Sequence, residues 1–175
     1  MENENKKIEV DDSNLGGWSI SRELFDTIAM LLDGVTNPTI LELGSGTGTK
    51  ELRKIATVIS VEHDPQYLPE THAPHKGFIV PLCNTTGWYE KQQMYKILKH
   101  GGYDLILVDG PLRNGRHGFL QNLWMFETDC AIIIDDTNRK EIKKMVDSLA
   151  KKFKRDYAEF EDQEKRKFAV FYRKI

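Results

Sequence analysis

The chain has 175 residues, enough for one domain built around a single hydrophobic core. Hydrophobic residues make up 39% of it and charged residues 30%, and 25 Lys and Arg against 27 Asp and Glu leave a net charge of −2. This balance lacks the basic surplus with which nucleic-acid-binding proteins neutralise phosphates, so a nucleic-acid partner is not expected.

The first twelve residues, MENENKKIEVDD, are polar and lack the apolar segment of a signal peptide. The longest apolar runs, such as 131–134, are too short to span a bilayer, so no membrane partner is expected. The two cysteines, Cys83 and Cys130, do not have the spacing of a zinc site. These features predict a cytoplasmic protein with reduced thiols.

Short apolar strands alternate with amphipathic helices along the chain. One helix is expected from a cap at Ser19 or Ser21 to about Leu32. Other helices are expected at 50–55, 89–98 and 119–127 and after a cap at Asn138, and strands at 39–43, 57–64, 77–82, 103–110 and 130–136. The segments RDYAEFED and KFAVFYRK, separated by QEKR, predict a terminal antiparallel hairpin. The fold class is therefore α/β: residues 1–175 form one Rossmann-like, doubly wound domain. Its seven-stranded sheet is mostly parallel, with helices on both faces.

In an open sheet of this kind, ligands bind beyond the carboxyl ends of the strands. Acidic residues collect at these ends from separate parts of the chain. They are Glu42, Glu62, Asp64, Asp109, Asp135 and Asp136. Because buried carboxylates cost free energy unless something neutralises them, their convergence predicts a functional site.

The first strand leads into GSGTG, with glycines at 44, 46 and 48. This spacing differs from the G-x-G-x-x-G fingerprint of dinucleotide-binding proteins. Glu42 lies two residues before the first glycine, where its carboxylate would repel a pyrophosphate. A ligand with a cationic amino acid end and no phosphate would be attracted instead.

The stretches LELGSGTG and VISVEHD resemble motif I and the second-strand acid of the class I S-adenosylmethionine-dependent methyltransferases, and the resemblance covers nearly the whole chain. It implies an antiparallel last strand and a cofactor site for S-adenosylmethionine. In that site the turn of Gly44, Ser45, Gly46 and Gly48 approaches the methionine part, with Glu42 and Asp109 nearby. Glu62 would bind the ribose hydroxyls, His63 would lie beside the adenine, and Asn84 would face the adenine amine.

The stretches LVDGP and IIIDDT resemble the metal-dependent small-molecule O-methyltransferases, such as the catechol and caffeoyl-CoA enzymes. The resemblance implies that Asp109, Asp135 and Asp136 hold Mg²⁺ or a similar cation, which would lower the pKa of an acceptor hydroxyl. Catalysis would centre on Asp109. Alternatively, Asp109 binds the amino group of the cofactor through water, and one of the later acids caps the next helix.

The loop after the fourth strand, PLRNGRHG, leaves further alternatives open. His117 is a candidate general base or a solvated loop residue. Arg113 and Arg116 either bind an acidic substrate or are exposed. Trp18, at the end of the segment 1–18, either covers the cofactor as part of a lid or packs in the core.

The function expected from this resemblance is methyl transfer from S-adenosylmethionine to a small-molecule or sugar-like hydroxyl. The sugar-like acceptor follows from VDGP…GR, which resembles the glucuronoxylan O-methyltransferase-type branch. VDGP also differs from the Asn/Asp-Pro-Pro-aromatic signature of enzymes that methylate nucleic-acid amino groups. The alternatives are a nicotinamide oxidoreductase, a non-catalytic binding module that kept the fold, and an RNA methyltransferase. The oligomeric state is not predicted.

Overall fold

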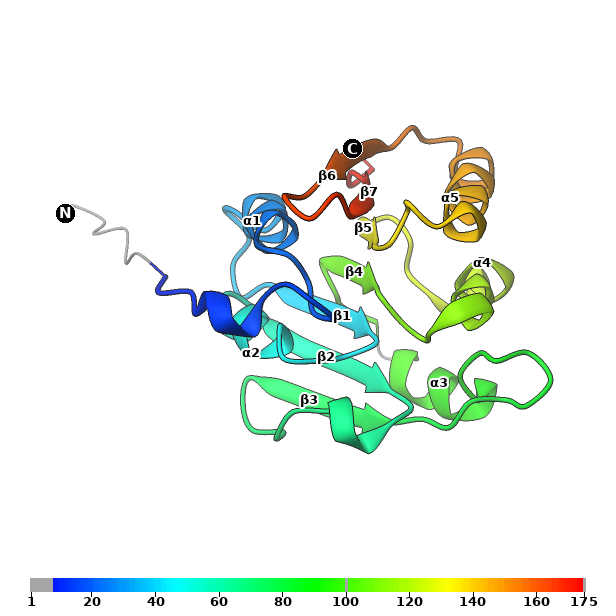
Figure 1. Ribbon diagram of the computed structural model, residues 1–175. Helices are drawn as coiled ribbons and strands as arrows, with labels where there is room; N and C mark the ends of the chain where they lie inside the picture. Colours follow the sequence, from blue (N-terminus) through cyan, green and yellow to red (C-terminus); the bar gives the residue numbers. More distant parts are fainter. Residues whose placement is uncertain (1–7, 100, 175) are drawn as a thin grey trace.

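The computed structural model describes residues 8–99 and 101–174. A seven-stranded sheet crosses the molecule in the order β3-β2-β1-β4-β5-β7-β6 (Figure 1). The strands are β1 (Thr39–Leu43), β2 (Thr57–Glu62), β3 (His75–Ile79), β4 (Leu105–Val108), β5 (Ala131–Ile134), β6 (Ala158–Glu161) and β7 (Lys167–Phe171). Strands β1 to β5 pair in parallel, and β7 pairs antiparallel with both β5 and β6. This confirms the predicted α/β class, the doubly wound sheet and the antiparallel last strand.

Helices cover both faces of this sheet (Figure 1). They are α1 (Arg22–Leu31), α2 (Thr49–Leu52), α3 (Lys91–Leu98), α4 (Gly118–Gln121) and α5 (Lys140–Phe153), with 3₁₀ turns η1 (Asp12–Asn14), η2 (Pro65–Tyr67), η3 (Arg113–His117) and η4 (Leu123–Met125). No helix within residues 8–99 and 101–174 is long and apolar enough to cross a membrane.

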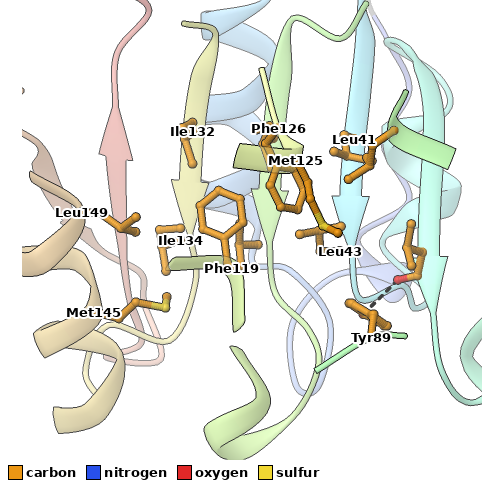
Figure 2. Packing of buried hydrophobic residues seen from close by; sticks show 14 of the residues in the cluster. Leu41, Leu43, Tyr89, Phe119, Met125, Phe126, Ile132, Ile134, Met145 and Leu149 are labelled. Atoms are coloured by element: carbon orange, nitrogen blue, oxygen red, sulfur yellow. Dashed lines mark hydrogen bonds between the residues drawn. The ribbon is translucent and has the colours of Figure 1, made fainter. Parts of the chain in front are cut away.

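The apolar strand residues alternate between two cores, as the period of a strand requires. On one face, Leu41, Leu43 and Ile134 pack with Phe119 of α4 and Met145 of α5 (Figure 2). On the other face, a second set packs with α1 and α2. Its members include Leu24, Ile28, Ile40, Leu52, Val58, Leu105 and Ile133. Because every central strand is buried on both sides, the strands read as almost continuous apolar runs.

Two predicted helix starts have different outcomes. Ser21 caps α1, since its hydroxyl accepts a hydrogen bond from the Leu24 amide at 3.2 Å, as expected for a serine before an apolar face. The predicted cap of α5 at Asn138 is wrong, because the helix begins after Arg139, which makes no side-chain capping bond.

Two other expectations are also corrected. The strand expected at 77–82 runs from His75 to Ile79, because it is an edge strand that tolerates polar residues and because Pro81 has no N–H for the ladder. The helix expected at 119–127 is split into α4 and η4. Asn122 lies outside the helical region (φ −118°, ψ 25°), and its side-chain amide donates to the Gly118 carbonyl at 2.7 Å, so the last turn is not continued.

Candidate functional site

The carboxyl ends of β1 and β4 touch through two glycines. Gly44 has φ +86°, and a Cβ added to it would lie 2.5 Å from the Gly110 backbone nitrogen. A Cβ added to Gly110 would lie 2.6 Å from the Gly44 Cα, and the Gly110 amide donates to the Leu43 carbonyl at 2.5 Å. Only glycine fits this approach, so the turn after β1 and the loop after β4 form one continuous surface.

The other two glycines of the turn have different surroundings. A Cβ added to Gly46 would meet no atom within 4 Å, and the residue has no positive φ. A Cβ added to Gly48 would meet Ser19 and Ile20, and the Gly48 amide donates to the Ser19 hydroxyl at 2.7 Å. Gly48 is therefore needed to bring the segment before α1 against the turn, whereas Gly46 faces open space.

The Glu62 carboxylate holds the glycine turn against the end of β2. It accepts hydrogen bonds from the backbone amides of Ser45 at 3.0 Å, His63 at 2.6 Å and Asp64 at 2.9 Å, and Glu62 is only 4% exposed. The His63 ring is partly exposed, and its Nδ1 lies 2.6 Å from Glu62 Oε1. The structure thus brings together Glu62, His63 and Ser45, three of the residues predicted for the cofactor site.

Glu42 lies beneath the turn, between β1 and α2, and is 2% exposed. Its carboxyl group accepts hydrogen bonds from the Ser60 hydroxyl at 2.5 Å and the Thr49 hydroxyl at 2.9 Å, and Ser60 is 2.9 Å from His75 Nε2. Burial raises the pKa of Glu42 to about 8, although these hydroxyls oppose the shift. Sequence reasoning did not find Ser60 and His75, although a serine inside the apolar strand TVISVE was a detectable signal.

At the other half of the carboxyl edge, the guanidinium of Arg116 lies between the acids after β4 and β5. Its Nη1 donates to the Asp136 carboxylate at 3.1 Å and to the Asp135 carbonyl at 3.0 Å. Its Nη2 donates to the Asp109 carboxylate at 3.2 Å and to the Asp109 carbonyl. Asp136 has φ +59°, and its amide donates to Asp135 Oδ1 at 2.7 Å.

Burial and neighbouring charges raise the pKa values of Asp109 and Asp135. Desolvation raises the pKa of Asp109; Arg116 opposes the shift and Asp136 adds to it. Desolvation, with the negative charges of Asp109 and Asp136, also raises the pKa of Asp135 to about 7. The Asp109 side chain is 27% exposed, so its carboxylate is anchored on Arg116 and remains accessible. A carboxylate with a raised pKa is a better proton acceptor than an ordinary aspartate.

The structure decides between two pairs of alternatives. Arg116 is 1% exposed, so the prediction of an exposed loop arginine is wrong for this residue. Trp18 is 93% exposed, so packing of this side chain in the core is wrong. His117 is partly exposed and directly follows Arg116, and Asn84 is exposed on the turn after β3. The side chain of Arg113 is outside the described part of the structure.

The segment before α1 packs against α2, beside the glycine turn. The Asp11 amide and the Asn14 side chain donate to the Glu51 carboxylate at 3.0 and 2.8 Å, and the Thr47 hydroxyl donates to the Asn14 carbonyl at 3.0 Å. Residues 1–7 of the predicted lid segment lie outside the described residues. Contacts with Glu51, Thr47 and Gly48 place residues 11–19 beside the glycine turn.

The two cavities described in the structure lie away from this edge. The larger, about 780 Å³, lies between β3 and α3 and includes Ile59, Phe78 and Ile97. The smaller, about 280 Å³, lies between the start of α1 and the hairpin, near Arg22 and Arg166.

Comparison with solved structures finds the same fold in methyltransferases. The O-methyltransferase TomG of Streptomyces achromogenes, in complex with S-adenosylmethionine, has a TM-score of 0.64 at 10% identity, over 97% of this chain and 93% of TomG. An O-methyltransferase of Bacillus cereus with bound S-adenosylhomocysteine has a TM-score of 0.61 at 12% identity, over 92% and 86%. A precorrin-6y C5,15-methyltransferase of Geobacter metallireducens has a TM-score of 0.58 at 12% identity, over 93% and 96%.

No protein-family model matches the sequence, and no curated protein matches it either. At these identities the structural likeness establishes the fold: the chain has the Rossmann-like fold of class I S-adenosylmethionine-dependent methyltransferases.

Proposed function

We propose that this protein transfers a methyl group from S-adenosylmethionine to a hydroxyl of a small or sugar-like molecule. The observation that carries the proposal is the Glu62 carboxylate, which is held against the glycine turn at the edge where Gly46 faces open space. A vicinal diol such as a ribose suits a fixed carboxylate, and a backbone without side chains lets the rest of the ligand approach closely. The residues present therefore fit S-adenosylmethionine.

The relatives with the same fold support this choice of cofactor, since two of them were crystallised with S-adenosylmethionine or S-adenosylhomocysteine. Bound S-adenosylmethionine would supply a methyl group from a sulfonium, whose sulfur would keep the electron pair of the C–S bond as the acceptor oxygen takes the methyl group. The hydroxyl proton must then go to a base. Asp109 has the accessibility and the raised pKa for this role, and His117 on the same loop is a second candidate.

The remaining site residues have supporting roles in this proposal. Gly44 and Gly110 bring the turn and the Asp109 loop together, so the methyl donor and the base share one surface. Such positioning supplies much of the rate of an in-line displacement. Asn84 and His63 would border the adenine. Cys83 and Cys130 are free thiols, which fit the reducing cytoplasm as the compartment.

Calorimetric titration with S-adenosylhomocysteine tests the cofactor site. We expect micromolar binding to the wild type and binding weakened about 10- to 100-fold in Glu62→Gln, because two charge-assisted hydrogen bonds are lost. Gly46→Leu should abolish binding without loss of thermal stability, since its side chain would enter open space. Glu141→Gln, on the exposed face of α5, is the matched control and should bind like the wild type.

Two outcomes would contradict the proposal. Binding of NADH in place of S-adenosylhomocysteine would make the protein an oxidoreductase with the same sheet. Binding that is unchanged in both Glu62→Gln and Gly46→Leu would place the ligand elsewhere on the molecule.

A further inference from the structure

Arg116 is held inside the protein by tight packing of the segment η3–α4. A Cβ added to Gly115 would overlap the Gly87 carbonyl oxygen, and one added to Gly118 would overlap the Trp88 ring. Gly115 and Gly118, which lie on either side of Arg116 in the chain, therefore pack tightly against the loop before α3. This contact turns the Arg116 side chain inward, where it is 1% exposed.

The guanidinium contacts four oxygen atoms from two strand ends: one carboxylate and one carbonyl of Asp109, the carboxylate of Asp136 and the carbonyl of Asp135. Carboxylate and carbonyl oxygens from converging loops are also the ligands that Mg²⁺ and Mn²⁺ prefer. The positive charge of Arg116 thus lies among the donors that the sequence assigned to a divalent cation.

These donors do not fit a divalent cation in addition to the arginine. Asp109 Oδ1 and Asp136 Oδ2 already accept from Arg116, and Asp135 Oδ1 accepts from the Asp136 amide. A metal ion bound to them would lie close to a buried guanidinium, and like charges repel strongly where water is scarce. Within the described residues, no three His, Cys, Asp or Glu side chains are arranged to hold a metal ion.

We infer that Arg116 is a permanent cation of this site, which takes the place of a divalent metal ion and positions Asp109. Two consequences follow for methyl transfer, and both rest on the proposed function. The reaction needs no metal, and the acceptor needs only one hydroxyl, because no metal is present to chelate a vicinal pair. Arg116 is a positioning residue here, since it acts through Asp109 and does not contact the acceptor.

The inference is tested by using electron paramagnetic resonance to measure the binding of Mn²⁺ to EDTA-treated protein. We expect wild-type protein to show no binding tighter than about millimolar, since the oxygens are already neutralised. Arg116→Ala removes the guanidinium, so its Mn²⁺ affinity should rise at least about tenfold, and Mn²⁺ should raise its melting temperature. Arg139→Ala is the matched control. It removes a partner of the same Asp136 carboxylate, 3.1 Å away, but one that is 36% exposed, and it should gain no Mn²⁺ binding.

Arg116→Gln, which keeps some hydrogen bonds without the charge, replaces Arg116→Ala if that variant does not fold. Micromolar Mn²⁺ binding by the wild type that is lost in Asp136→Asn would overturn the inference, and so would loss of S-adenosylhomocysteine binding in EDTA that Mg²⁺ restores. If S-adenosylhomocysteine does not bind under any condition but the Mn²⁺ results are as expected, the proposed function fails and the role of Arg116 as the cation stands.

Discussion

At the β1–β2 half of the carboxyl edge, Glu42 and Glu62 accept hydrogen bonds from hydroxyls and backbone amides, whereas at the β4–β5 half Asp109 and Asp136 face the guanidinium of Arg116. Neutral donors do not cancel a charge, and burial raises the pKa of Glu42 to about 8. A guanidinium stays charged at every relevant pH. The first half therefore holds its buried acids with neutral donors, whereas the second half holds them with a permanent cation.

The largest effect is expected when the guanidinium of the β4–β5 half is removed. Arg116→Met should lower the free energy of unfolding at pH 7.5 by roughly 3–5 kcal/mol, because it leaves the Asp109 carboxylate without its hydrogen-bonded counter-ion, whereas Asp136 keeps Arg139. The loss should be smaller at pH 5.5 than at pH 7.5, because burial raises the pKa of Asp109, loss of the opposing guanidinium raises it further, and a protonated carboxyl carries no charge. Urea unfolding at the two pH values measures both effects. Arg139→Met should cost less than about 1 kcal/mol, since this pair is partly exposed; equal losses in the two variants would refute the distinction.

A smaller effect is expected where the two halves meet. Gly44→Ala should lower the free energy of unfolding by roughly 2–4 kcal/mol, because alanine is strained at φ +86° and its methyl group would overlap the Gly110 backbone. Gly46→Ala, two residues later, meets open space and should change stability by less than about 0.5 kcal/mol. Thermal or chemical unfolding of the two variants measures this difference. Similar stabilities would mean that the backbone around Gly44 and Gly110 moves apart at little cost in free energy.

The third prediction concerns the β1–β2 half and depends on pH. Below its ordinary pKa of 4.5, Glu42 is protonated in both the folded and the unfolded chain. Between pH 4.5 and about 8 only the folded chain keeps the proton, so the free energy of unfolding falls as pH rises; above that range the loss is complete. Glu42→Gln removes this slope and should be more stable than the wild type at pH 8.5, by on the order of 2–3 kcal/mol.

Chemical unfolding of wild type and Glu42→Gln at pH 5 and pH 8.5 provides the measurement. Glu23→Gln, on the surface of α1, is the matched control and should not change the slope with pH. The contradicting outcome is a wild-type free energy of unfolding that changes as little between pH 5 and pH 8.5 as that of Glu42→Gln. It would show that Glu42 is ionised in the folded state across this range.

The sequence predicts the fold well because the information is local. The alternation of strands and helices, the cap at Ser21 and the glycine turn each depend on a few neighbouring residues. The strand-end acids also follow from local patterns, since parallel strands bring their carboxyl ends to one edge. The start of β3 was missed because an edge strand need not be apolar, and the break at Asn122 depends on one side-chain hydrogen bond.

The role of Arg116 could not be predicted in the same way. An arginine in a glycine-rich loop is exposed in most proteins. Its burial here depends on how Gly115 and Gly118 pack against Gly87 and Trp88, which are almost thirty residues earlier in the chain. The pairing of Glu42 with Ser60 and His75 depends likewise on the register of three strands. Contacts of this kind are set by tertiary packing and leave no periodic signal.

The place of β7 between β5 and β6 has a consequence for how the protein is made. Residues 167–171 are synthesised after every other strand, yet they pair with β5 in the interior of the sheet. Until they leave the ribosome, β5 is an open edge of four apolar residues, Ala131–Ile134, which can pair with another chain. We therefore expect a nascent chain that stops before β7 to depend on chaperones. The sheet is complete only when β7 has been synthesised and has paired with β5.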